Sequence, residues 1–264
     1  MAEFLRIAGG VVQTAVRGFV HPDSGRRVTL VGVAAAGEPD YYTQLRRLVT
    51  DLQADGACVH SEASDLDAAR MPADVRAEER VVLHELTRRH EHAVARVGQV
   101  FGWVDRACAL PVAEGWRVTD LHVVEVLRLS ATAARHHVGR LTRGTDPSSQ
   151  DPRMVCWFAL VTVLLLRAHA SNSRLLHRAL TRRAGGPIRQ RRTWIALYEV
   201  DQEPAGQDVV LLWNAQGLPD IAAGLTTRGF QPDEPIWLWV GHLPTVGAIL
   251  HALSDPQTPE PTPQ

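Results

Sequence analysis

Val28-Thr-Leu-Val-Gly-Val-Ala-Ala-Ala-Gly-Glu-Pro-Asp-Tyr-Tyr42 joins an apolar strand pattern to the start of a helix. Residues 28–34 are almost continuously apolar, which predicts a strand buried on both faces. Glu38-Pro39 then marks a helix start, because proline is well tolerated at the first helical position. Apolar residues follow at helical spacing: Tyr42, Leu45, Leu48, Val49 and Leu52. A buried strand that leads directly into an amphipathic helix predicts an α/β unit.

The flanking sequence continues this pattern. Residues 11–20 are rich in β-branched side chains and precede turn residues at 21–25, which predicts a hairpin with the strand at 28–34. A short strand is expected at 57–60, and strands and helices alternate again at 209–213, 219–228, 235–240 and 245–253. Helical patterns occupy the middle, at 73–98, 120–141, 152–169 and 171–183. We therefore expect an α/β fold with a mixed, mostly parallel central sheet flanked by helices and with a helical middle section.

Length and composition bound the domain organisation. The 264 residues, of which 45% are hydrophobic and 22% charged, are sufficient for one domain, expected over residues 1–253. Residues 254–264 contain four prolines and no aromatic side chain, so we expect a disordered tail.

Charge and cysteine content narrow the setting and the partners. The net charge of -1 provides no overall attraction to nucleic acid or to an anionic membrane. Cys58, Cys108 and Cys156 show no Cys-x-x-Cys spacing, which favours a reducing, cytoplasmic location. The apolar run at 154–166 is shorter than the roughly 20 residues that a membrane-spanning helix needs. The expected partner is a small ligand or a protein, and neither a membrane nor a nucleic acid.

Stretches near both ends resemble the TraB/GumN/TIKI family. Residues 28–42, followed by Gly56-Ala-Cys-Val-His-Ser-Glu62, are similar to the family's strand ending in Gly-x-x-His and its second strand carrying Val-His-x-Glu. Val209-Val-Leu-Leu-Trp-Asn-Ala-Gln-Gly-Leu-Pro-Asp-Ile221, with Gly229-Phe230 after it, resembles the family's strand, Gly-x-x-His-Leu-Pro and helix. Gly115-Trp116 to Asp120 is similar to a Trp-to-Asp segment found between them.

The resemblance implies metal-assisted hydrolysis, but this chain lacks the histidines. Ala35 stands three residues after Gly32, where the first histidine is expected, and Gly217 stands where the second is expected. Neither side chain can coordinate a metal. The resemblance therefore implies a TraB/TIKI-like fold that has lost its catalytic site, needs no cofactor and acts by binding a ligand or partner.

The same resemblance marks the residues of the former site. They are Gly32, Ala35, His60, Glu62, Asp120, Trp213 and Gly217. Among them Glu62 is the candidate for any remaining catalytic role. His60 and Glu62 are two apart on the expected strand, so their side chains project from the same face.

An alternative alignment supplies a histidine. Trp239-Val-Gly-His-Leu-Pro244 also contains Gly-His-Leu-Pro next to a strand end. Under this alternative, His60, Glu62 and His242 form a three-ligand site for Mn, Co or Zn with an open coordination position. The chain would then be a metal-dependent hydrolase of peptide or ester bonds.

A second alternative rests on arginine. Between residues 152 and 198 there are nine arginines and no acidic residue. Arg174, Arg178 and Arg182 recur at four-residue steps, and Arg189 extends the series. These residues predict an anion-binding face, so the arginine-rich helix expected over 174–192 is a candidate surface for an acidic partner.

Overall fold

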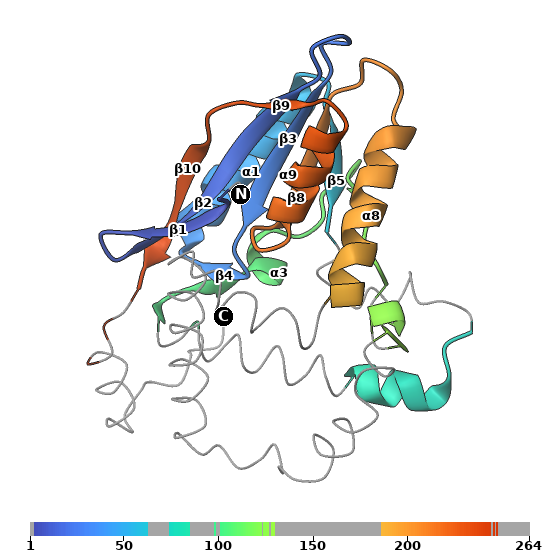
Figure 1. Cartoon of the computed structure of the whole chain (residues 1–264). Helices are drawn as coiled ribbons and strands as arrows, with labels where there is room; N and C mark the ends of the chain where they lie inside the picture. Colours follow the sequence, from blue (N-terminus) through green and yellow to red (C-terminus); the bar gives the residue numbers. More distant parts are fainter. Residues whose placement is uncertain are drawn as a thin grey trace.

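A mixed eight-stranded sheet organises the part of the chain that the structure describes (Figure 1). This computed structural model describes residues 3–62, 74–84, 98, 101–122, 124–126, 128–129, 186–243, 245 and 247. Helices flank the sheet, which confirms the predicted α/β class. The helical patterns expected at 152–169 and 171–183 and the proline-rich tail lie outside the described residues, as do most of those expected at 73–98, 120–141 and 245–253.

Four strands form the parallel part of the sheet. In spatial order they are β3 (Arg27–Val33), β8 (Val209–Asn214), β5 (Cys58–Ser61) and β7 (Arg117–Val118). Neighbours are parallel throughout, with Leu30 opposite Leu211 and His60 opposite Leu211 on the other side. Leu30 and Leu211 are fully buried, as the continuous apolar runs predict for strands covered on both faces.

The remaining strands are antiparallel and assemble on β2 (Val11–Val20). One edge of β2 pairs with β1 (Leu5–Ala8) and then with β3, which confirms the predicted hairpin. The other edge pairs with β10 (Ile236–His242) and β9 (Gln231–Pro232). A strand at 235–240 was expected, and β10 confirms it.

Three helices cover the two faces of the sheet. In Figure 1, α1 (Pro39–Ala54) lies behind the strands, whereas α8 (Gly186–Gln202) and α9 (Leu218–Thr227) lie in front of them. The helix predicted after Glu38 begins as expected and buries Tyr41, Tyr42, Leu45 and Val49. The predicted helix after Gly217 is also present and buries Leu218, Ile221, Ala222 and Leu225.

Most of helix α8 was not predicted from the sequence, because the expected arginine-rich helix ended at residue 192. Its first turns contain Arg189, Arg191 and Arg192, and Trp194 and Tyr198 remain partly exposed. The residues that α8 buries are Ala196, Leu197 and Val200, which make too narrow an apolar stripe to stand out in the sequence. Among the described residues, none of the helices has the length and apolar character needed to cross a membrane.

Candidate functional site

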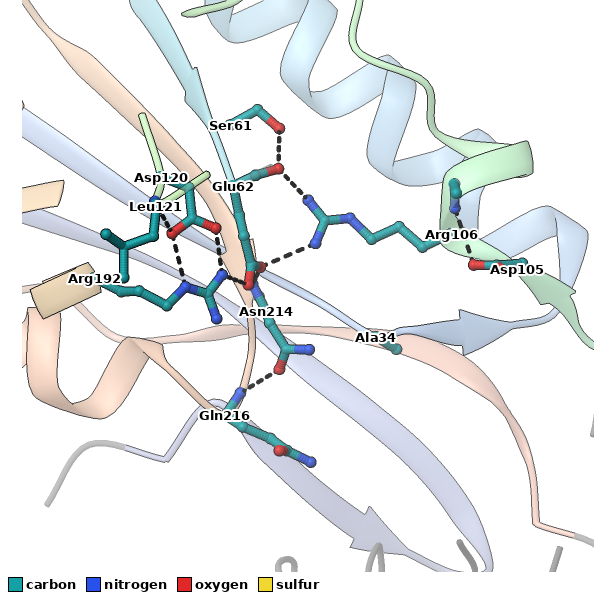
Figure 2. A network of polar contacts seen from close by, with 12 residues as sticks. Ala34, Ser61, Glu62, Asp105, Arg106, Asp120, Leu121, Arg192, Asn214 and Gln216 are labelled. Atoms are coloured by element: carbon teal, nitrogen blue, oxygen red, sulfur yellow. Dashed lines mark hydrogen bonds and ion pairs between the residues drawn. The ribbon is translucent and has the colours of Figure 1, made fainter. Parts of the chain in front are cut away.

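The carboxyl ends of the parallel strands meet at one edge of the sheet. In open α/β sheets this edge is the usual place for a ligand site, because the loops after the strands converge there. Glu62 follows β5, Asp120 lies two residues after β7, and Asn214 ends β8. Figure 2 shows that these residues belong to one polar network.

Glu62 is the centre of the network. The residue is only 5% exposed, and both of its carboxylate oxygens accept hydrogen bonds. Arg106 donates from Nη1 to Oε2 at 3.0 Å, and the backbone N–H of Asn214 donates to the same oxygen. Arg192 donates from Nη2 to Oε1. Arg106 also donates from Nη2 to the backbone carbonyl of Glu62, at 3.2 Å, so the guanidinium holds this residue at two points.

Arg192 joins Glu62 to Asp120. Its Nε donates to Oδ1 of Asp120 at 2.7 Å, and its Nη2 contacts Oδ2 at 2.5 Å. The Asp120 side chain is 3% exposed and also accepts from the backbone N–H of Leu121. Two carboxylates therefore face two guanidinium groups, and the network is close to neutral in charge.

The two carboxyl groups respond differently to this environment. Burial alone would raise the pKa of Glu62, but the charges of Arg192 and Arg106 and the hydrogen bond from Asn214 hold it below its ordinary value. Burial raises the pKa of Asp120, and its bonds to Arg192 only partly offset this, while the charge of Glu62 adds to the increase. Glu62 is thus the carboxylate that the network stabilises as an anion.

Local structure fixes the position of Arg106. It begins the short helix α3 (Arg106–Ala109), whose N-cap residue Asp105 accepts from the backbone N–H of Ala107 at 3.0 Å. The backbone N–H of Arg106 donates to the carbonyl of Ala35 at 3.0 Å. Ala35, which stands where the family resemblance calls for histidine, is therefore close to the network but contributes its backbone.

The glycines predicted for the site serve packing. A Cβ on Gly32 would lie 2.9 Å from the carbonyl oxygen of Ala15, so β3 and β2 could not keep their approach. A Cβ on Gly217 would lie 3.2 Å from the ring of Trp213, which is buried beneath it. A histidine at 217 would need this tryptophan to shift. Gly217 is the N-cap residue of α9, and Trp213 fills the space behind it.

His60, two residues before Glu62, has a different partner. Its Nε2 lies 3.1 Å from Oε1 of Glu203, the residue that follows α8. The α8 region therefore supplies a partner to both residues, Arg192 to Glu62 and Glu203 to His60.

The three-ligand metal site of His60, Glu62 and His242 is not formed, and that prediction is wrong. His242 ends β10, which is separated from β5 by β2, β3 and β8. Its backbone N–H donates to Glu38, and its ring packs edge-on against Trp239. The Gly-His-Leu-Pro motif shows only which residues are neighbours in the sequence. The pairing of β10 with β2 decides where its histidine lies in the fold.

The predicted anion-binding arginines are only partly within the described residues. Arg174, Arg178 and Arg182 lie outside them. Arg189 forms a two-point contact with Asp220 on α9, at 2.5 Å and 3.1 Å. This arginine is therefore neutralised within the fold.

Sequence reasoning missed Arg106 and Arg192. Arg106 is 44 residues from Glu62, and Arg192 is 130 residues away, so no spacing links them to it. The excess of arginine around residue 192 was visible, but its acidic partners were not. The structure defines the site class as a closed arginine–carboxylate network at the carboxyl edge of a parallel sheet.

Comparison with protein-family models, with curated proteins and with solved structures found no match to this chain. The resemblance to the TraB/GumN/TIKI family stays a prediction from the motifs.

Proposed function

We propose that this chain is a non-catalytic, TraB/TIKI-like protein that acts by binding a small ligand or a protein partner. The observation that carries the proposal is that both carboxylate oxygens of Glu62 already have hydrogen-bond donors. Metal-assisted hydrolysis needs carboxylate oxygens with free lone pairs and an ion beside them. Both oxygens of Glu62 instead accept hydrogen bonds from Arg106, Arg192 and Asn214. A divalent cation at this place would have to displace two guanidinium groups.

A groove on the outside of the sheet's helical layer is the proposed binding surface. It lies between α8 and α9 and has a volume of about 630 Å³, within the range typical of ligand pockets. Trp194, which is 50% exposed, offers an apolar contact, and the Arg189–Asp220 pair offers polar groups. The lining residues are Gly186, Arg189, Gln190, Thr193, Trp194, Leu197, Asp220 and Arg228.

The loss of catalysis at Glu62 is tested by metal analysis. The full chain is purified in Mn, Co or Zn buffer, dialysed, and compared with Glu62→Gln and Asp120→Asn for metal content and for hydrolysis of peptide and ester substrates. Circular dichroism verifies that each variant is folded. We expect Glu62→Gln to change neither quantity. Metal or hydrolytic activity that disappears in folded Glu62→Gln would show that the site is catalytic.

Binding in the groove is tested with compounds and peptides that raise the melting temperature of the chain. Trp194→Ala should abolish the stabilisation because it removes the exposed apolar wall of the groove. Trp239→Ala is the matched control, since Trp239 is exposed to a similar extent (43%) but lies on β10. Equal losses in both variants would argue against the groove.

A second candidate function is recognition of an acidic protein segment by the outer side of α8. The guanidinium of Arg191 lies 4.5 Å from the ring centre of Trp194, which stacks on Tyr198 at 5.1 Å. Exposed aromatic and arginine side chains in contact are typical of protein interfaces. Arg191→Glu should abolish binding of an acidic peptide, whereas Arg47→Glu, exposed on α1, should not.

A further inference from the structure

A second cluster of reactive side chains lies on β5, apart from the Glu62 network. It consists of Cys58, His60 and Glu203, whose ligand atoms all lie within 4.8 Å of one another. Among the described residues, no other group of three or more His, Cys, Asp or Glu side chains brings its ligand atoms this close together. Cys58 and His60 are two apart on the strand and therefore project from the same face, toward Glu203.

We propose that Cys58, His60 and Glu203 bind a divalent transition-metal ion of the zinc class. Thiolate, imidazole and carboxylate are the three ligand types that Zn²⁺ takes in proteins. The thiolate and the carboxylate together balance the charge of the ion. Three protein ligands leave a fourth position for water, and Cys58 is the partly exposed member of the cluster.

The separation of the two buried ligand atoms is close to that of a tetrahedral ion. Nε2 of His60 lies 3.1 Å from Oε1 of Glu203. With metal–nitrogen and metal–oxygen bonds of about 2.0–2.2 Å, two ligand atoms of a tetrahedral site are roughly 3.3–3.5 Å apart. A shift of a few tenths of an ångström would therefore admit the ion between them.

His60 is the most deeply buried member of the cluster. It is fully buried, and its Nδ1 has no hydrogen-bond partner in the protein. Burial lowers the pKa of His60, and the nearby carboxylate of Glu203 only partly offsets this. The hydrogen bond to the Glu203 carboxylate places the proton of a neutral ring on Nε2, so an ion bound at this nitrogen would take the place of that proton, which would move to Nδ1.

Arg117 is the competitor of the metal. It contacts the same Oε1 of Glu203, but 59% of its side chain is exposed, so it can move into solvent. A bound cation would replace its charge.

The test is a titration of the full chain with Zn²⁺ and a parallel titration with Co²⁺. A Co²⁺–thiolate complex absorbs in the near ultraviolet and so reports binding to Cys58. We expect one equivalent bound, with this absorption present. Cys58→Ser should abolish the absorption and lower the affinity by at least about 10- to 100-fold. Cys108→Ser is the matched control because Cys108 is exposed and outside the cluster. Arg117→Ala should increase the affinity, since it removes the competitor for Glu203.

The proposal is overturned if the chain binds no equivalent, or if Cys58→Ser retains the absorption. It is also overturned if Arg117→Ala weakens binding, because the cluster would then be a hydrogen-bonded structural group. Glu62→Gln should leave the titration unchanged. The Glu62 and Cys58 variants therefore test the proposed loss of catalysis and the metal site separately.

Discussion

Glu62 shows why removing one member of a buried ion network costs more than the network itself contributes. Arg106 and Glu62 are both less than 10% exposed, so each charge depends on the other for compensation. Forming such a pair roughly balances desolvation against attraction, but breaking it leaves a charge buried without a partner. The network therefore acts as a constraint on how β5, α3 and α8 fit together.

This asymmetry predicts different costs for the two carboxylates. Glu62→Gln should lower the free energy of unfolding by about 3–5 kcal/mol, because Arg106 loses its ionic partner. Asp120→Asn should cost less, about 0.5–1.5 kcal/mol, because the ionisation of Asp120 opposes folding at neutral pH and because Arg192 retains Glu62. Urea denaturation of the three proteins at neutral pH measures both values. Equal costs would mean that Arg106 does not depend on Glu62.

The directions of the two pKa shifts predict opposite pH effects. Glu62 has a lowered pKa, so its contribution is complete above its ordinary value of 4.5 and is lost as the pH falls through the folded value. Asp120 has a raised pKa, so its ionisation opposes folding at neutral pH and its protonation in acid favours folding. Glu62→Gln should therefore flatten the acid loss of stability, whereas Asp120→Asn should steepen it. Urea denaturation between pH 3 and pH 7, roughly the range over which these groups titrate, measures both slopes.

At the scale of elements, α8 and β5 form one functional unit. The helix supplies Arg192 to Glu62, and Glu203 directly after it contacts His60. Each site thus takes one side chain from the α8 region, Arg192 for the Glu62 network and Glu203 for the proposed metal site. A ligand in the groove between α8 and α9 would contact α8 directly.

The end of β10 is fixed by a glycine. Gly241 lies at a register shift in the strand and has φ 153°, and a Cβ there would lie 2.6 Å from Nε1 of Trp103. Gly241→Ala should therefore cost about 1–3 kcal/mol more than Gly10→Ala. Gly10 is the control because it also has a positive φ, 81°, but nothing lies within 4 Å of its Cβ position. Thermal denaturation compares them, and equal costs would place the effect in the backbone angle alone.

At the scale of the whole molecule, stability should be greatest in the middle of the sheet. Strands β3 and β8 have partners on both sides and are buried on both faces, whereas β1 lies at one end of the strand path. Amides of Leu30 and Leu211 should exchange hydrogen only on global unfolding. Those of β1 should exchange through smaller openings. Native-state hydrogen exchange at increasing denaturant concentration distinguishes the two, and uniform exchange would contradict this order.

The sequence by itself determined the strands and helices whose apolar patterns are strong. The buried run of β3 and the helical spacing of α1 follow from hydrophobic periodicity, which is a local property. The strand-end position of Glu62 could be predicted in the same way, whereas the two-residue strand β7 before Asp120 was not predicted because it is too short to show a pattern. Helix α8 could not, because its arginines and exposed aromatic residues obscure the narrow face that it buries.

Only the tertiary structure decided what surrounds Glu62. Arg106 and Arg192 are too far along the chain for any spacing to indicate them, and they reach Glu62 because β5, α3 and α8 pack at one edge. His242 was excluded in the same manner, since the pairing of β10 with β2 sets it on the far side of the sheet. Periodicity acts over a few residues, whereas charge compensation in a buried site acts through space. The ends of the strands were therefore readable in the sequence, and the partners that close the site were not.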